Sequence, residues 1–288
     1  MARGTPRLHL YIAMSSDGRE SAREGRRQTR IALVGCGRIA RLSHLEVLAR
    51  HPDAELVAFA DIDRESLAMA RERAPRARAF EDYRELLSVV GPEAVLVALP
   101  TNLHRDAAIA AFGAGAHLYL EKPIAGTLRE AKEIYDSWKQ TSLVGRIGFN
   151  ARFNRLYVRL RDAVAGGEIG RPVAARSAFT ALFPAEATWR TKPSTGGGAL
   201  LELASHHVDL MRFVFGSGAR SIRATTWSNR GDDESAMLEI ELGNGVHVQT
   251  LVAYGTIEED SFEIFGTEGK LRVNRYDSLT VAKIAPRA

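Results

Sequence analysis

The sequence predicts an α/β protein with a parallel sheet in its first half and a mostly antiparallel, open sheet in its second half. Between residues 30 and 148, short apolar runs typical of strands alternate with longer stretches typical of helices. This alternation favours a parallel sheet covered on both faces. After Gly148 the rhythm changes to closely spaced runs in which apolar and polar residues alternate. Such runs are typical of an antiparallel sheet that is covered on one face.

The spacing of these segments predicts the elements and the domain boundaries. The strands of the first half are expected at 30–35, 54–60, 77–80, 94–99, 117–120 and 143–149, with helices near 38–50, 64–74, 82–89, 104–114 and 127–140. The second half is expected to hold helices near 155–165 and 199–215 and strands at 172–180, 220–228, 235–242, 246–254, 260–265 and 269–274. We therefore expect a disordered basic tail over 1–29, one domain over 30–148, and an α+β domain over 149–288.

The first predicted strand breaks into a glycine turn, Gly35-x-Gly37-x-x-Ala40, before the first helical pattern begins. Gly35 permits a tight turn, Gly37 lets the backbone approach a pyrophosphate, and Ala40 lets the helix pack against the strand. Asp61 ends the second strand 21 residues after Ala40, where the ribose of a bound dinucleotide needs a hydrogen-bond acceptor. The first domain is therefore expected to be a Rossmann domain that binds NAD, and NADP less readily, because a 2′-phosphate would face the Asp61 carboxylate.

Composition argues against several other classes of protein. The 288 residues are 45% apolar and 26% charged, as in an ordinary globular protein. Residues 1–30 hold seven arginines against three acidic residues and so carry the whole net charge of +4, which leaves 32 basic and 32 acidic residues elsewhere. A neutral body argues against nucleic-acid binding. The apolar run at 8–14 is too short to span a membrane, and the single Cys36 fits a reducing cytoplasm.

Polar loops follow the fourth and fifth predicted strands at the carboxyl edge of the parallel sheet, where such sheets bind ligands. The fourth strand runs into Pro100-Thr101-Asn102-Leu-His104, and the fifth runs into Glu121-Lys122-Pro123. We expect both loops to border the cofactor, with Lys122 near its nicotinamide end. The alternatives are plain turn chemistry for the first loop and a solvated, inert lysine in the second.

A run of glycines at 196–198 precedes a helical pattern in which Glu202, His206 and Asp209 share one face. A glycine run can bring the backbone against a ligand, so this face is a candidate for acid/base chemistry. The alternative is a carboxylate–histidine pair that only stabilises the helix. A metal site that also used His207 is disfavoured, because one helix cannot direct two adjacent histidines at one ion. We expect no metal and a structural role for His207.

Four blocks of sequence also occur, in this order, in a known family. They are the Gly35–Ala40 turn, Pro100-Thr-Asn-x-His104, Glu121-Lys122-Pro123 and Gly196-Gly-Gly-Ala-Leu-Leu-Glu202-Leu-Ala-Ser-His206-His-Val-Asp209. Together with shorter pieces such as Gly148-Phe-Asn150-Ala-Arg152-Phe, they span about residues 30 to 270. In these blocks the chain resembles the glucose–fructose oxidoreductase and inositol dehydrogenase (Gfo/Idh/MocA) family of NAD(P)-dependent sugar and polyol dehydrogenases.

The resemblance implies roles for individual residues. Lys122 would bind and polarise the substrate oxygen, His206 would act as acid or base, and Glu202 would orient or charge-balance the imidazole. The cofactor-binding residues would be Gly35, Gly37, Arg38, Ile39, Asp61, Pro100, Thr101, Asn102, His104, Glu121, Lys122 and Asn150.

Two features depart from the family pattern. Glu202 stands where the family usually has aspartate, and its side chain is longer by one C–C bond, roughly 1.5 Å. Relatives generally continue beyond the position of Gly269 through more strand and a closing helix, whereas this sequence ends at Ala288. Two interpretations of that end stay open, a short branch of the family or a truncated polypeptide.

The predicted function is that of a cytoplasmic, NAD-dependent oxidoreductase. It would move a hydride between nicotinamide and a secondary hydroxyl of a sugar, nucleotide-sugar or cyclitol. Two alternatives are a redox-neutral, glycosidase-like enzyme that keeps NAD bound and a catalytically silent NAD(H)-binding regulator. The expected partners are a small polyol or sugar and a second copy of the chain, not nucleic acid or a membrane. A homodimer or homotetramer would form through the second sheet, with Leu251, Val252 and Tyr254 as candidate contacts.

Overall fold

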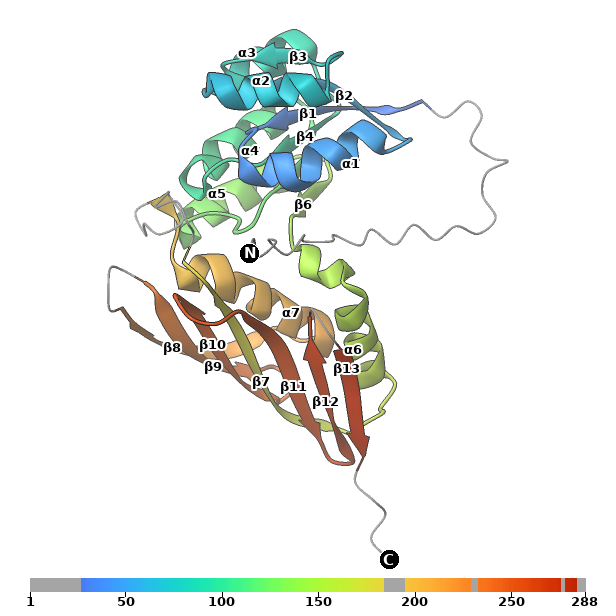
Figure 1. Cartoon of the computed structure of the whole chain (residues 1–288), viewed down its shortest axis with the longest axis vertical. Helices are drawn as coiled ribbons and strands as arrows, with labels where there is room; N and C mark the ends of the chain where they lie inside the picture. Colours follow the sequence, from blue (N-terminus) through green and yellow to red (C-terminus); the bar gives the residue numbers. More distant parts are fainter. Residues whose placement is uncertain (1–26, 184–194, 229–232, 276–277, 284–288) are drawn as a thin grey trace, which may run out of the picture.

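The computed structural model describes residues 27–183, 195–228, 233–275 and 278–283. Within them the chain forms a six-stranded sheet from its first half and a seven-stranded sheet from its second half. Figure 1 shows the two sheets one above the other, blue to green above and yellow to red below. The predicted fold class is confirmed. Residues 1–26, which hold most of the expected tail, lie outside the described residues.

The first sheet is entirely parallel and has the strand order β3-β2-β1-β4-β5-β6. Its strands are β1 (Thr29–Val34), β2 (Ala54–Ala60), β3 (Arg78–Phe80), β4 (Ala94–Val97), β5 (His117–Leu120) and β6 (Gly145–Ile147). The order reverses at β1, so the connections after β1 and β4 leave the sheet in opposite directions. A crevice at the carboxyl ends of these two strands is the place where sheets of this kind bind ligands.

Helices cover both faces of this sheet, as the strand–helix alternation predicts. The turn η2 (Ala40–His44) continues into α1 (Leu45–Arg50), and both share a core with α2 (Arg64–Arg73) on one face. The other face packs against α3 (Tyr83–Val90), α4 (His104–Gly113) and α5 (Leu128–Lys139). Local sequence explains where several helices begin, because Asp63 caps α2, Asp82 caps α3, and Thr127 forms a capping box with Glu130 at α5.

The second sheet has the order β13-β12-β11-β7-β10-β9-β8, and all its pairs are antiparallel except β7–β10. Its strands are β7 (Pro172–Ala181), β8 (Ala219–Trp227), β9 (Ser235–Leu242), β10 (His247–Tyr254), β11 (Glu259–Gly266), β12 (Gly269–Asn274) and β13 (Ser278–Lys283). The alternation expected in β9 is observed, since Ala236, Leu238, Ile240 and Leu242 are all buried. The strand β13 was not predicted, and most of its residues are exposed.

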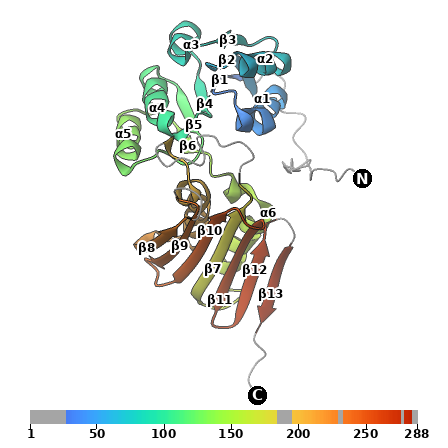
Figure 2. The ribbon, with the colours of Figure 1, turned by 60° about the vertical axis from the view of Figure 1, so that its left-hand side comes forward.

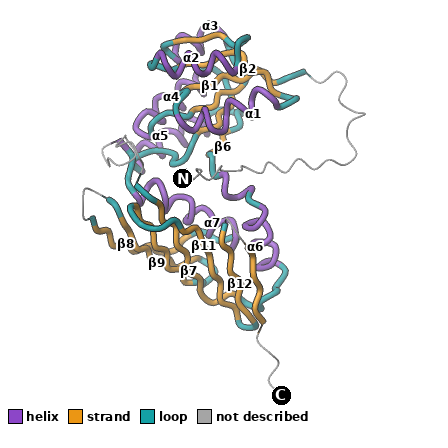
Figure 3. Tube along the Cα trace, viewed as in Figure 1, coloured by secondary structure: helices purple, strands orange, loops and turns teal. Residues whose placement is uncertain are grey.

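Only one face of the second sheet is covered by described helices. The helices α6 (Arg155–Ala165) and α7 (Ser205–Phe215) lie along that face, and no described helix lies over the other (Figures 1 and 2). Short turns enter both helices, η4 (Asn150–Phe153) before α6 and η7 (Leu200–Ala204) before α7. Figure 3 shows that α7 lies at the edge of this layer that faces the first sheet. Across the described residues, no helix has the length and apolar character that crossing a membrane requires.

Candidate cofactor and active site

The glycine turn has the conformation that the sequence predicts. Gly35 has φ +92°, and a Cβ there would lie 2.5 Å from the carbonyl oxygen of Ala98, so only glycine fits. A Cβ on Gly37 would meet nothing within 4 Å, which leaves open space beside the start of the helix. Arg38 is exposed, Ile39 is partly buried and Ala40 is fully buried. The turn therefore offers backbone N–H groups beside a free volume, as a bound pyrophosphate requires.

Asp61 lies directly against this turn. Its Oδ2 accepts a hydrogen bond from the backbone N–H of Cys36 at 2.7 Å, and its Oδ1 accepts one from Asp63 N–H at 2.9 Å. The carboxylate is thus held at the end of β2 beside the glycine turn, in the place expected for the ribose acceptor. Cys36 is fully buried, and burial, aided by the charge of Asp61, raises the pKa of its thiol to about 12. The thiol is therefore neutral and fills space.

The loop after β4 differs from expectation in one residue. Pro100 precedes a short 3-10 turn, η3 (Thr101–Leu103), in which Thr101 is buried and Asn102 is exposed. His104 is only 1% exposed, and its Nδ1 and Nε2 lie 2.9 Å from the carbonyl oxygens of Pro123 and Leu99. Both ring nitrogens are therefore occupied by backbone. The predicted cofactor contact by the His104 side chain is replaced by a structural role, in which it ties η3 to the loop after β5.

The loop after β5 brings Lys122 against the helix of the second sheet. The Nζ of Lys122 donates a hydrogen bond to the carbonyl oxygen of Glu202 at 3.1 Å and lies 3.5 Å from Glu202 Oε1. The two side chains are 13% and 5% exposed. Two of the three predicted catalytic residues, which are 80 positions apart in the sequence, therefore meet between the two sheets.

His206 lies one turn further along the same helix. Burial, the positive charge of Lys122 and, more weakly, that of Arg275 hold the pKa of His206 well below its usual value, while the charge of Asp260 opposes them. Its Nδ1 is buried and has no hydrogen-bond partner among the described residues. At neutral pH the ring is therefore neutral and able to accept a proton.

The other polar residues of this helix point to different partners. Asp209 forms a two-bond pair with the guanidinium of Arg152, at 2.7 and 2.6 Å. His207 is fully buried, stacks on Phe179 and places Nε2 3.2 Å from Asp260 Oδ1. Among the described residues, no three histidine, cysteine or acidic side chains gather as a metal site would need. The helix thus directs Glu202 and His206 toward the candidate site and uses Asp209 and His207 to anchor itself.

Three residues near the site were missed in the sequence. His44 contacts Glu121, with 2.7 Å between Nε2 and Oε1. Asp233 is the one non-glycine residue with positive φ in the described part of the chain, and its carbonyl oxygen accepts from Ala199 N–H at 2.7 Å where the glycine-led helix begins. Asp260 lies behind His207. Periodicity gave no signal for them, because each acts through a contact distant in sequence. Asn150, a predicted cofactor contact, is exposed at the start of η4.

Comparison with known proteins agrees with this architecture. The family model "Oxidoreductase family, NAD-binding Rossmann fold" matches residues 29–149, and "GFO/IDH/MocA C-terminal domain" matches residues 157–272. The myo-inositol 2-dehydrogenase of Thermotoga maritima is 29% identical over 269 residues, which cover 88% of this chain and 77% of the relative. The 1,5-anhydro-D-fructose reductase of Ensifer adhaerens is 30% identical over 249 residues, which cover 84% and 74%.

Solved structures give the same result. The WlbA dehydrogenase from Bordetella pertussis, in complex with NADH and UDP-GlcNAcA, has a TM-score of 0.82 and 28% identity, covering 91% of this chain and 79% of its own. Levoglucosan dehydrogenase in complex with NADH has a TM-score of 0.82 and 27% identity, covering 91% and 78%. Since the two family models together match most of the sequence, the chain belongs to the Gfo/Idh/MocA family of NAD-binding oxidoreductases.

Proposed function

We propose that the protein is an NAD-dependent dehydrogenase that oxidises a secondary hydroxyl of a sugar, nucleotide-sugar or cyclitol, or reduces the corresponding ketone. The observation that carries the proposal is the meeting of Lys122 and Glu202, at 3.5 Å, beside the neutral His206. In this proposal residues 30–148 bind the cofactor, and residues 149–288 supply the acid/base helix and the surface for self-association. The sugar and inositol dehydrogenases among the relatives support the substrate class.

The residues around the glycine turn fit a dinucleotide. The free volume at Gly37 suits a pyrophosphate, and the Asp61 carboxylate beside it suits a ribose hydroxyl. Bound NAD would supply the hydride acceptor for the alcohol carbon. The protein would supply the orientation of the substrate and the handling of its proton.

The proton and the developing negative charge are assigned to different side chains. His206, which is neutral at pH 7, takes the hydroxyl proton as the C–H hydride leaves the substrate carbon. The ammonium of Lys122, whose charge acts on His206, stabilises the alkoxide that forms in the transition state. Glu202 balances the charge of Lys122 and holds its head group in place. Proton and hydride thus leave the alcohol by separate routes, and a ketone remains.

The test is a screen of sugars, nucleotide-sugars and cyclitols for substrate-dependent NADH absorbance. With the best substrate, His206→Ala and Lys122→Ala should each lower kcat/KM by about 10²–10⁴-fold. Their Kd for NAD should stay near the wild-type value, because neither residue touches the glycine turn or Asp61. His51→Ala, on an exposed histidine near the end of α1, is the matched control. Near wild-type oxidation by His206→Ala would end the assignment of the base.

The same assay separates the two alternatives. A dehydrogenase with an exchangeable cofactor forms one NADH per substrate oxidised. A redox-neutral enzyme would convert its substrate without net NADH, and a regulator would bind NAD without any turnover. Product analysis by mass spectrometry alongside the absorbance measurement distinguishes all three outcomes.

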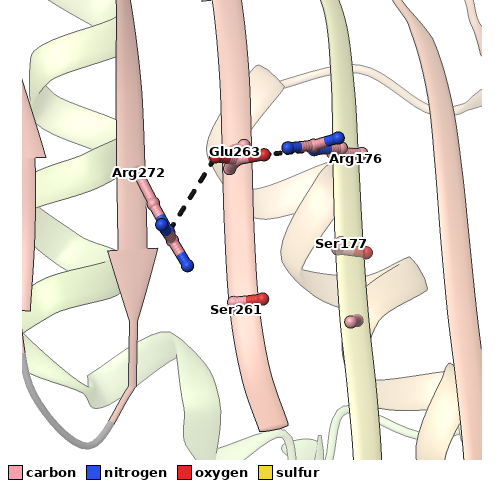
Figure 4. Close-up of a pocket in the computed structure, with 6 residues that line it drawn as sticks. Arg176, Ser177, Ser261, Glu263 and Arg272 are labelled. Carbon is pink, nitrogen blue, oxygen red and sulfur yellow. Dashed lines mark hydrogen bonds and ion pairs between the residues drawn. The ribbon is translucent and has the colours of Figure 1, made fainter. Parts of the chain in front are cut away.

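Self-association is the second part of the proposal, because one face of the second sheet lacks a cover among the described residues. Three large apolar side chains on that face, Trp227, Met237 and Phe265, are 42%, 44% and 37% exposed. Figure 4 shows the polar part of the face, where Glu263 lies between Arg176 and Arg272. These residues line a cavity of about 240 Å³. A mixed apolar and charged surface of this kind suits a second copy of the chain.

The candidate contacts need one correction. Val252 is fully buried on the face that packs against α6 and α7, and Tyr254, two residues further along β10, lies on the same face. Only Leu251, which pairs with Met237, faces the open side of the sheet. The prediction erred because it took consecutive strand residues for neighbours on one surface, whereas side chains alternate between faces.

A further inference from the structure

A histidine and a glutamate connect the helix after the glycine turn to the loop that carries Lys122. His44 lies at the end of η2, and Glu121 directly follows β5. The Nε2 of His44 lies 2.7 Å from Glu121 Oε1, and the two side chains are only 12% and 14% exposed. None of the steps proposed above uses His44.

The carboxylate of Glu121 is enclosed on its other sides. Its Oε2 accepts a hydrogen bond from the backbone N–H of Lys122 at 3.2 Å. A Cβ on Gly148 would lie 3.1 Å from this oxygen and 2.8 Å from the hydroxyl of Tyr119. The backbone that follows β6 therefore also packs closely against Glu121. The ring of Tyr119 meets His44 edge-on, with 5.6 Å between the ring centroids. Glu121 therefore has little freedom to move while His44 is in place.

Lys122 is consequently held at both ends. Its backbone N–H is bound by Glu121, and its Nζ is bound by Glu202. On the next residue, the carbonyl oxygen of Pro123 contacts the buried ring of His104 at 2.9 Å. A loop of three residues thus has a separate polar partner at each position. The partner of Glu121 belongs to the cofactor helix.

We propose that His44 is a positioning residue for Lys122. Acting through Glu121, it fixes the backbone from which the ammonium reaches the substrate oxygen, and it joins that position to the helix that begins at the cofactor turn. This inference rests on the proposed role of Lys122. Removing one partner of a buried histidine–carboxylate pair leaves the other unpaired and destabilises the fold, so a purely structural role predicts a lower melting temperature and unchanged reaction chemistry.

The first test needs no substrate and measures the reactivity of Lys122 in the whole protein. Wild type, His44→Leu and His44→Gln are labelled with trace acetic anhydride, and the rate at each lysine is read by mass spectrometry relative to the exposed Lys139. His44→Leu should label Lys122 several-fold faster, because its loop is released. The amide of His44→Gln can still donate to Glu121, so its rate should stay near the wild-type value. Equal rates in all three proteins would overturn the proposal.

A matched control is a second histidine that is associated with β5. His117 begins this strand, at the opposite end from Lys122, and its Nδ1 accepts a hydrogen bond from Val144 N–H at 2.9 Å. His117→Leu makes the same chemical change on the strand that leads to Glu121 and should leave the Lys122 labelling rate unchanged. If His117→Leu raised the Lys122 labelling rate as much as His44→Leu does, the effect would reflect a general loosening of the protein. That result would overturn the specific role of His44.

The second test is a double-mutant cycle on turnover. His44→Leu should lower kcat by roughly ten- to a hundred-fold, with the Kd for NAD unchanged, and His44→Gln should recover most of the loss. In the Lys122→Ala background, His44→Leu should cost nothing further, because the residue that it positions is gone. Losses that multiply would show that His44 acts independently and would overturn the proposal. Wild-type turnover by Lys122→Ala would instead refute the proposed function, and the labelling rates would then decide the positioning.

Discussion

Asp61 accepts a hydrogen bond from the backbone N–H of Cys36, so the carboxylate that follows β2 is held directly against the glycine turn. The two residues are 25 positions apart, and their contact joins the two parts of the cofactor site, the phosphate turn and the ribose acceptor. The contact also fixes the negative charge at one place, which has a direct consequence for the choice of cofactor.

We expect NAD to bind more tightly than NADP, because a 2′-phosphate would be repelled by the fixed charge of Asp61. Asp61→Ser should narrow the difference between the two dissociation constants, measured by fluorescence titration. Asp63→Ser is the matched control, since serine can still cap α2 in place of Asp63 and the NAD/NADP ratio should not change. Equal or tighter binding of NADP to the wild type would contradict the prediction.

Alanine at the two glycines of the turn should affect stability and NAD binding differently. Gly35→Ala places a Cβ 2.5 Å from a backbone oxygen at φ +92°, so the variant should lose stability and NAD binding together. Gly37→Ala meets no atom of the protein within 4 Å. Its Tm should stay close to wild type while its Kd for NAD rises at least about ten-fold, because the methyl group occupies the space for the pyrophosphate. Thermal melting and NAD titration on both variants check this, and a destabilised Gly37→Ala would argue against it.

Most of the fold follows from patterns that are local in the sequence. Alternating strands and helices, the glycine turn, and the caps at Asp63 and Asp82 are each set by neighbouring residues, and the elements lie within a few positions of their predicted bounds. The exception is the strand β13, which was not predicted although it pairs with β12, the strand just before it in the sequence. Its residues do alternate, with Leu279 and Val281 beside polar neighbours, but four of its six residues are exposed, so burial does not reinforce the pattern.

The pH dependence of oxidation should report the surroundings of His206. Burial and the positive charge of Lys122 lower the pKa of His206. The base is active only when it is neutral. A plot of kcat/KM against pH should therefore have a rising limb below the ordinary histidine range, where His206 loses its proton, and be level at pH 7. Asp260 favours the protonated ring, so Asp260→Asn should move the limb to lower pH, by roughly one unit.

Tyr157→Phe is the control for that experiment. Tyr157 donates a 2.5 Å hydrogen bond to the same oxygen of Asp260 that faces His207, so its loss removes a contact of the carboxylate but not its charge. The rise of kcat/KM with pH should therefore stay in place in this variant, measured between about pH 4.5 and 8.5, two units either side of the ordinary histidine pKa. A limb that moves equally in both variants would mean that packing, and not charge, sets the pKa of His206.

Self-association should depend on Leu251. Light scattering at micromolar concentration is expected to give at least a dimer for the wild type, and Leu251→Arg should shift it toward monomer by placing an unpaired charge at the interface. Leu128→Arg, the same substitution at a leucine that is 87% exposed at the start of α5, should leave the mass unchanged. A monomeric wild type would count against the proposed interface.

The candidate site was predictable in its residue types and less so in its pairings. Lys122, Glu202 and His206 were recognisable from their motifs, yet spacing along one helix suggested a Glu202–His206 pair, whereas the structure sets Glu202 against Lys122. His104 was read as a cofactor contact, and only its burial between two carbonyl oxygens reveals its structural role. These pairings join different elements, and helix periodicity carries no information about the facing element.

The single parallel pair of the second sheet, β7 with β10, bears on how the protein acquires activity. The helix that carries Glu202 and His206 lies within the connection between these two strands, which comprises the 65 residues 182–246. Domains generally fold as units, with the N-terminal one first during synthesis, and the first sheet is complete at β6 (Gly145–Ile147), before any strand of the second sheet has been made. During synthesis, a competent nucleotide fold can therefore precede the assembled catalytic helix, and cofactor capture can precede turnover.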